Sequence, residues 1–213
     1  MTAKAISVVA KTLTPFCYHS LMVQSGTATL PELIGDRAMA FGLAAALGMT
    51  AARLGLPPRN YRRHLAAMPF RTSVFTTDHP RLLPPLTRRL NLDAEAGLQR
   101  KIQDMAKKGN LKDFFHVQEV PSEQVFKGAV FGLDGFDPFD ASDTGEIVIR
   151  VGLHRNGMVL LTRAKTDERV HLNAATAATF DRELEVERYC LHSMQLTPPM
   201  DLNAAATEVI QWM

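Results

Sequence analysis

The 213-residue sequence predicts an α+β fold with an antiparallel sheet. β-compatible runs precede and follow one strongly helical segment, and a clear hairpin signal stands late in the chain. In that signal, residues 146–152 alternate between apolar and polar, and residues 158–164 form the predicted partner strand. Asn156 and Gly157, between the two strands, accept the positive φ angles of a tight turn. We expect one domain over residues 1–213, with enough apolar content (46%) to bury a core.

The first elements are a strand and a helix. Residues 5–13 form a β-compatible run that Pro15 closes, because proline cannot donate to a central ladder. A loop is expected over residues 24–28. Thr29 and Glu32 then have the spacing of a capping box, which predicts a helix that starts there and stops near Gly48.

The middle of the chain is predicted to leave the sheet and return to it. Residues 70–77 alternate and are rich in β-branched and aromatic residues, so we interpret them as a strand. Residues 78–112 form a long basic insertion, within which residues 93–108 fit a short amphipathic helix. Two further strands are expected over residues 114–120 and 124–133.

The last part of the chain gives weaker signals. The loop over residues 134–140 crowds acids, glycine and aromatics, but it lacks the ligand spacing of an EF-hand, which favours a surface loop over a metal site. Residues 170–172 are expected to extend the sheet, residues 180–192 show a helical charge pattern, and residues 197–212 are interpreted as a loop with a short apolar tail.

The charge is concentrated in one segment. Residues 53–112 hold nine arginines and four lysines against four acids, a balance of +9, whereas the whole chain carries only +2. A solvated helix face is usually laced with acids, and here the acids are few. The segment therefore predicts contact with a polyanion, while the acidic remainder leaves faces for protein partners.

RNA suits this segment for a physical reason. Arginine and lysine neutralise phosphates, and aromatic rings or arginine planes stack on unpaired bases. Phe70 and Phe75 also stand in the segment, but an alternating strand buries one face, so Tyr61 is the better stacking residue. The predicted RNA contacts are Tyr61, Arg62, Arg63, Arg71, Arg88, Arg89, Lys101, Lys107 and Lys108.

Signatures of other chemistry are absent from the sequence. It has no Walker loop, dinucleotide fingerprint, nucleophile elbow, zinc cluster or HExxH motif, so we expect no cofactor and no metal. Tyr61, His64 and His79 with a nearby lysine offer the groups of a metal-independent ribonuclease, although a histidine among arginines is more often a further contact. Cys17 and Cys190 lack metal-ligand spacing and are expected to be reduced thiols.

Two stretches carry a family resemblance. Residues 33–43 (LIGDRAMAFGL) and residues 159–172 (VLLTRAKTDERVHL) resemble the CRISPR-associated RAMP proteins, and most of all the small Cas-five form of type I-D-like and related systems. The resemblance implies a ferredoxin-like (RRM-like) antiparallel sheet with an inserted basic thumb and a β-rich C-terminal part. Residues 78–112 stand where such a thumb would be.

The resemblance also implies a function. It is that of a non-catalytic subunit of a CRISPR interference complex, which binds the 5′ handle of the guide RNA (crRNA) and caps the backbone. Its partners would be the backbone and large subunits, with target DNA reached through the complex, in the cytoplasm and away from membranes. Two alternatives stay open: an endoribonuclease that processes precursor crRNA, and a scaffold whose basic segment docks an acidic protein. No cleaving triad is matched, and the glycine-rich loop common near the end of RAMP proteins is not evident.

Overall fold

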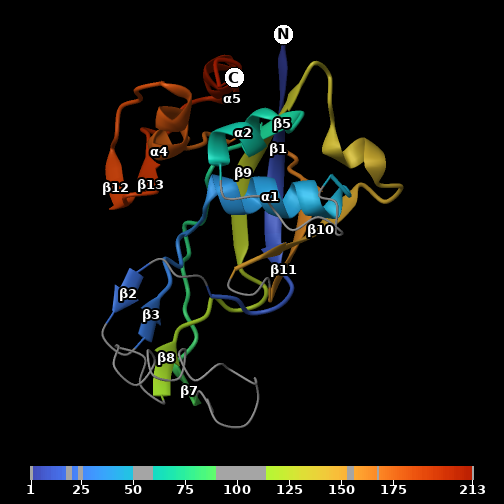
Figure 1. The fold of residues 1–213 in the computed structure, drawn as a ribbon. Helices are drawn as coiled ribbons and strands as arrows, with labels where there is room; N and C mark the ends of the chain where they lie inside the picture. The colour runs from blue at the N-terminus through green and yellow to red at the C-terminus, as the bar shows by residue number, and fades with distance from the viewer. Residues whose placement is uncertain are drawn as a thin grey trace.

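The computed structural model describes residues 2–17, 21–23, 26–49, 60–89, 114–152, 156–166 and 168–212. It confirms an α+β fold with a curled antiparallel sheet, whose strands follow the order β10-β11-β1-β9-β6-β4, with β5 also paired to β9 (Figure 1). These strands are β1 (Ala3–Thr12), β4 (Leu33–Ile34), β5 (Phe70–Thr72), β6 (Phe75–Thr76), β9 (Val125–Leu133), β10 (Glu146–Val151) and β11 (Gly157–Arg163). We call this the main sheet.

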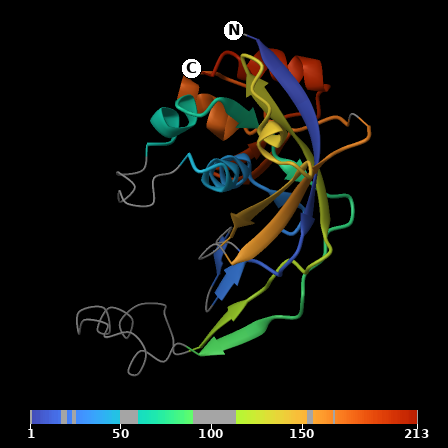
Figure 2. The ribbon, with the colours of Figure 1, turned by 90° about the vertical axis from the view of Figure 1, so that its right-hand side faces the viewer.

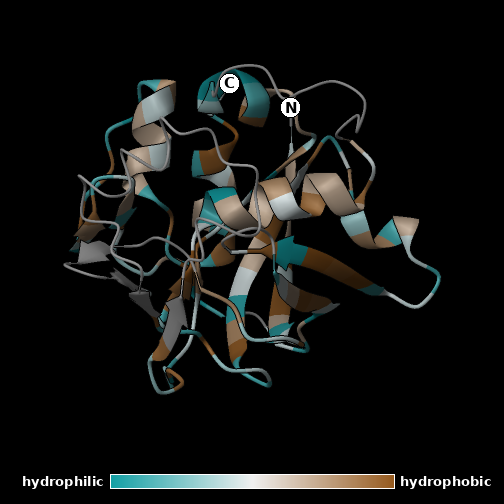
Figure 3. Cartoon of the chain, turned by 60° about the horizontal axis from the view of Figure 1, so that its bottom comes forward, coloured by the Kyte–Doolittle hydropathy of each residue, from teal (hydrophilic) through white to brown (hydrophobic). Residues whose placement is uncertain are grey.

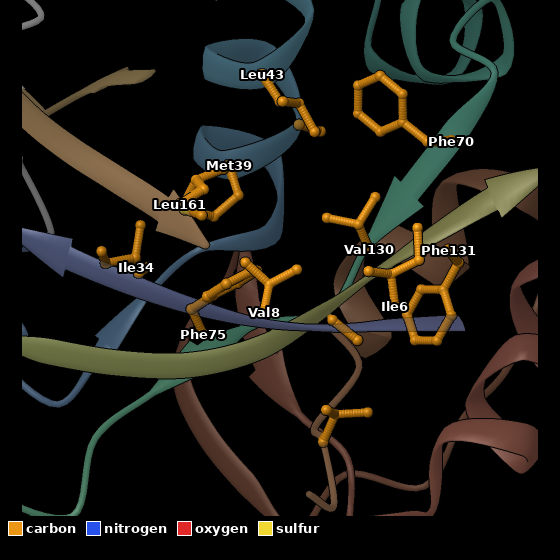
Figure 4. Close-up of a cluster of buried hydrophobic side chains, with 14 of the residues drawn as sticks. Ile6, Val8, Ile34, Met39, Leu43, Phe70, Phe75, Val130, Phe131 and Leu161 are labelled. Carbon is orange, nitrogen blue, oxygen red and sulfur yellow. The ribbon is translucent and has the colours of Figure 1, made fainter. Parts of the chain in front are cut away.

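One face of the main sheet is covered by α1 (Asp36–Ala46), which packs against β10 and β5. Burial alternates along β10 and β11, so each of these strands presents one apolar row to the core, whereas β5 and most of β9 are buried on both faces (Figure 3 shows the hydropathy of the residues). Met39 and Leu43 of α1 lie over the row that includes Val8 (Figure 4). Gly42 permits this close packing, because a Cβ there would stand 2.9 Å from the carbonyl oxygen of Arg150.

The C-terminal part of the chain packs on the other face of β5. Thr72 and Arg71 are consecutive and therefore point to opposite faces. Thr72 Oγ1 donates to the carbonyl of Asp36 at the start of α1, whereas Arg71 donates to the carbonyl of Trp212, after α5. The elements of this part are α4 (Ala174–Ala177), η3 (Ala178–Phe180), β12 (Arg188–Leu191), β13 (Met194–Leu196) and α5 (Leu202–Val209).

A second sheet extends from one end of the main sheet (Figures 1 and 2). Its strands, in spatial order, are β2 (Leu21–Val23), β3 (Gly26–Ala28), β8 (Phe114–Val117) and β7 (Leu86–Arg89). Two backbone contacts hold together the chain segments that lead into this sheet. One is an antiparallel bridge between Phe16 and Val120, and the other is a hydrogen bond from Leu83 N to Glu119 O (2.8 Å). We call this projection the arm.

The predicted start of the first helix is wrong. Leu33 and Ile34 join the main sheet as β4, so the helix begins only at Asp36, after Gly35. The supposed capping residues have other partners: Thr29 Oγ1 donates to Gln118 O (2.8 Å), and Glu32 pairs with Arg188. The predicted stop is confirmed, because Gly48 has a positive φ of 71° just beyond the helix.

Other predicted elements divide in the same way. The strands near residues 5–13, 70–77 and 124–133 and the late hairpin are confirmed as β1, β5 with β6, β9, and β10 with β11. The helix predicted over residues 180–192 is wrong, because residues 183–187 form no helix and lead directly into β12. The tail predicted as a loop contains α5, whose first turn is capped by Asp201 Oδ1, an acceptor from Ala204 N. The predicted loop over residues 24–28 contains β3.

η1 (Pro138–Ala141) and α2 (Tyr61–Ala66) complete the described elements. None of the helices in these ranges combines the length and apolarity that a bilayer crossing needs. Cys17 and Cys190 form no disulfide, and the first is buried and the second partly buried.

Candidate nucleic-acid interface

The short helix α2 positions three of the predicted RNA contacts. Asn60 caps it by accepting a hydrogen bond from Arg63 N (2.9 Å), and the buried Leu65 anchors it to the core. Arg62 and Arg63 therefore project outward. Arg62 pairs with Asp181 at 2.6 Å, and about half of its side chain remains exposed, whereas Arg63 has no acidic partner among the described residues.

Tyr61 is held in a fixed orientation at the start of α2. Its ring meets Phe41 of α1 edge to face, with centroids 6.1 Å apart, and the Arg37 guanidinium lies 4.6 Å from the Tyr61 centroid. Arg37 is itself oriented, because it donates to Thr176 Oγ1 and Ala175 O, both at 2.9 Å. Sequence reasoning missed Arg37 and Phe41, although their i, i+4 spacing on a helix places them on one face.

Arg71 is not a surface phosphate contact, contrary to the prediction. Its residue is 2% exposed, and its guanidinium donates to the carbonyls of Met68, Phe70 and Trp212 at 2.8–3.0 Å. Burial lowers the pKa of Arg71 to about 10, which still leaves it charged at neutral pH. Because an alternating strand buries one face, this arginine points inward and ties the C-terminal segment to β5.

The remaining predicted contacts belong to the arm or lie beyond the described ranges. Arg88 and Arg89 are in β7, in register with Phe115 and Phe114 of β8. Lys101, Lys107 and Lys108 lie outside the described residues, as does the helix predicted over residues 93–108. The described part of the predicted insertion, residues 78–89, leads from the main sheet into the arm (Figure 2).

A cavity of about 210 Å³ opens beside Tyr61 and Arg37, between the start of α1, the end of β10 and the β12–β13 hairpin. Its walls are mainly apolar, and Leu33, Ile34 and Val151 among them are buried core residues. The buried carboxyl of Asp36 also lines it and accepts from Asn173 Nδ2 at 2.8 Å. Burial raises the pKa of Asp36 above its ordinary value, although its hydrogen bonds with Asn173 and Thr176 oppose the shift.

The groups considered for ribonuclease chemistry do not converge. Tyr61 and His64 both flank Phe41, whereas His79 lines a separate polar groove of about 460 Å³ with Lys127 and His171. In that groove Lys127 is paired with Glu168. His171 Nδ1 is 2.7 Å from Thr197 O. The groove mixes acids with bases, which does not favour a polyanion.

The acidic loop over residues 134–140 has a structural role. Asp137 is buried, and its carboxylate pairs with Lys4 and Arg163, each at 2.9 Å. Burial alone would raise the pKa of Asp137, but hydrogen bonds from these two cations hold it below its ordinary value. No group of three or more potential metal-ligating side chains occurs in the part of the chain that the structure describes.

Comparison of the chain with protein-family models and with curated proteins gives no significant match. The structure by itself therefore shows an α+β protein with a cationic and aromatic surface on α1 and α2.

Proposed function

We propose that the chain is a non-catalytic, RNA-binding subunit of a CRISPR ribonucleoprotein. In this proposal it holds the 5′ handle of the guide RNA through α2 and the arm. Its protein neighbours are the backbone and large subunits of an interference complex in the cytoplasm, through which it also approaches target DNA.

The distribution of ion pairs carries the proposal. Outside residues 53–112, acids of the described chain pair with six cations, namely Lys4, Lys11, Lys127, Arg163, Arg182 and Arg188, and leave Arg37, Arg150, Lys165 and Arg169 without an acid. Within that segment, the described residues form an ion pair at Arg62 and leave Arg63 without an acid. A segment with a balance of +9 and few internal acids keeps its charge for an external polyanion.

The topology supports a ferredoxin-like, RRM-like core for the same proposal. The strands β11-β1-β9-β5 are neighbours in this order and are antiparallel, and α1 lies between β1 and β5 in sequence. Such a core contains a second helix before its last strand, and here η1 and β10 stand at that point. The arm then corresponds to the thumb that the sequence resemblance implies.

The test is charge reversal on the arm. Replacing Arg88 and Arg89 by Glu is expected to weaken guide-RNA binding about tenfold or more and to reduce the slope of log K against log salt by about 2. Lys165→Glu combined with Arg169→Glu reverses the same charge away from the arm and α2, at exposed cations that have no acidic partner among the described residues, and it is expected to leave both quantities nearly unchanged. Filter binding at several salt concentrations measures them.

Equal binding by the arm variant and the wild type would remove the arm from the interface. The wild-type protein, incubated with end-labelled repeat RNA in EDTA, is expected to leave the RNA intact. A shorter product would replace the non-catalytic proposal by the endoribonuclease.

A further inference from the structure

The cavity beside Tyr61 has no role in the fold described so far. We propose that it holds one unpaired base of the bound RNA, stacked against the Tyr61 ring. This inference rests on the proposed function, since it names a contact of the same RNA.

The size and walls of the cavity fit a single base. Its volume of about 210 Å³ lies below the 300–1,000 Å³ or so of sites for drug-sized ligands, so it accepts one ring system rather than a whole nucleotide. Leu30, Leu33, Ile34 and Met194 give it apolar walls that suit the face of a base. Asp36 also lines the cavity, and its buried carboxyl accepts a hydrogen bond from Asn173 Nδ2.

Tyr61 is prepared for stacking before any ligand arrives. Phe41 supports the ring edge to face, and the Arg37 guanidinium lies 4.6 Å from the ring centroid. Arg37 donates to neutral oxygens of Thr176 and Ala175 and forms no ion pair with an acid of the described chain. An aromatic ring and a guanidinium at one cavity are the groups that bind unpaired bases and their phosphates.

The surroundings give the RNA backbone a path to the cavity. A groove of about 380 Å³ runs along α1 and shares Ala38, Val151 and Gly152 with the cavity wall. Arg150 lines this groove, is exposed and has no acidic partner among the described residues. Arg37 at the cavity and Arg150 in the groove are therefore the cations available to the phosphates beside an inserted base.

An apolar side chain of a protein partner would also fit a cavity of this volume. The observations favour the base, because Tyr61 belongs to the +9 segment and two of the residues that line the cavity and groove are arginines. A site for an aliphatic side chain needs neither.

The experiment uses the full chain and a single-stranded 12-nucleotide RNA in which 2-aminopurine replaces each base in turn. We expect quenching of 2-aminopurine fluorescence at one position, and about tenfold weaker binding when that position is made abasic. Tyr61→Ala is expected to abolish the quenching and to weaken binding about tenfold, whereas Tyr61→Phe keeps both. Tyr189→Ala, on the exposed edge of β12, is the matched tyrosine control.

A second variant blocks the cavity without removing the ring. Ala38 lines the cavity and is exposed, so Ala38→Trp is expected to abolish the quenching while the protein stays folded. Its control is Ala204→Trp, because Ala204 is exposed on α5, away from the cavity. If the wild type binds the RNA but no position is quenched and both cavity variants bind equally well, the base site is wrong and the proposed function stands. If Ala38→Trp releases a co-purified protein instead of RNA, the cavity belongs to a protein contact. If the wild type binds no RNA, both proposals fail.

Discussion

The main sheet and the basic segment use the same residue types in opposite ways. In the main sheet, Lys4 of β1 and Arg163 of β11 are neutralised locally by Asp137, although Arg150 of β10 has no acid among the described residues. In the basic segment, Arg63 is exposed without an acid among the described residues, and Arg88 and Arg89 lie on a sheet that projects from the core. On the proposed function, the exposed charge of the basic segment is available to RNA, whereas Lys4, Arg163 and Asp137 serve the stability of the main sheet.

The comparison predicts that matched apolar truncations affect the two sheets very differently. Phe75 of β6 is fully buried, and it packs so closely on β9 that a Cβ at Gly128 would stand 2.7 Å from its ring. Phe75→Ala is expected to lower the free energy of unfolding by about 4 kcal/mol. Leu86 of β7 is 46% exposed, so Leu86→Ala is expected to change it by less than about 1 kcal/mol. Urea denaturation measures both values. Equal losses would contradict the view that the main sheet contributes more to stability than the arm.

Two arginines of the basic segment are expected to have different roles, one in stability and one in RNA binding. Arg71→Met leaves three backbone carbonyls without their donor, so the free energy of unfolding is expected to fall by about 3 kcal/mol. Arg63→Met removes an exposed charge and is expected to change stability by less than about 0.5 kcal/mol while weakening RNA binding. Thermal denaturation and RNA titration of both variants separate the two roles. An Arg71 variant with full stability would show that its three hydrogen bonds do not stabilise the fold.

The smallest expected effect concerns pH. Because the pKa of Asp137 is lower in the folded chain than its ordinary value of 3.8, its ion pairs stabilise the fold at neutral pH. This stabilisation is lost as the pH falls from about 4 through the lowered folded value. Asp137→Asn is expected to cost about 2 kcal/mol at pH 7 and progressively less below pH 4. A constant difference between the variant and the wild type across this range would show that the two cations do not stabilise the carboxylate.

Local sequence patterns predicted the elements whose signals are short-ranged. The alternation of residues 146–151 predicted strand β10 and its hairpin with β11, because a period of two is a property of neighbouring residues. The tight turn predicted at Asn156 and Gly157 is wrong, because Gly157 lies in β11 opposite Val151 and its φ is not positive. The same alternation around Leu184 and Val186 was present, but the charges there were interpreted as helical. The capping-box prediction failed because a hydrogen bond to Gln118 and a pairing between β4 and β6 involve partners distant in the sequence.

The candidate site shows the same division. Counting charges located the basic segment and singled out Tyr61, but it placed Arg71 and Arg63 in one class. Their difference follows from strand parity and from the position of the Trp212 carbonyl, 141 residues away. Arg37 likewise becomes a partner of Tyr61 only when α1 and α2 pack together.

By itself, the sequence determined the α+β class, the main strands and the concentration of positive charge, since periodicity and composition are properties of neighbouring residues. Only the tertiary structure decided which cations are neutralised, which arginine is buried and where a cavity opens beside an aromatic ring. The physical reason is that burial and ion pairing depend on distances between residues far apart in the chain, and the packing of α1, α2 and the C-terminal hairpin on the main sheet sets those distances.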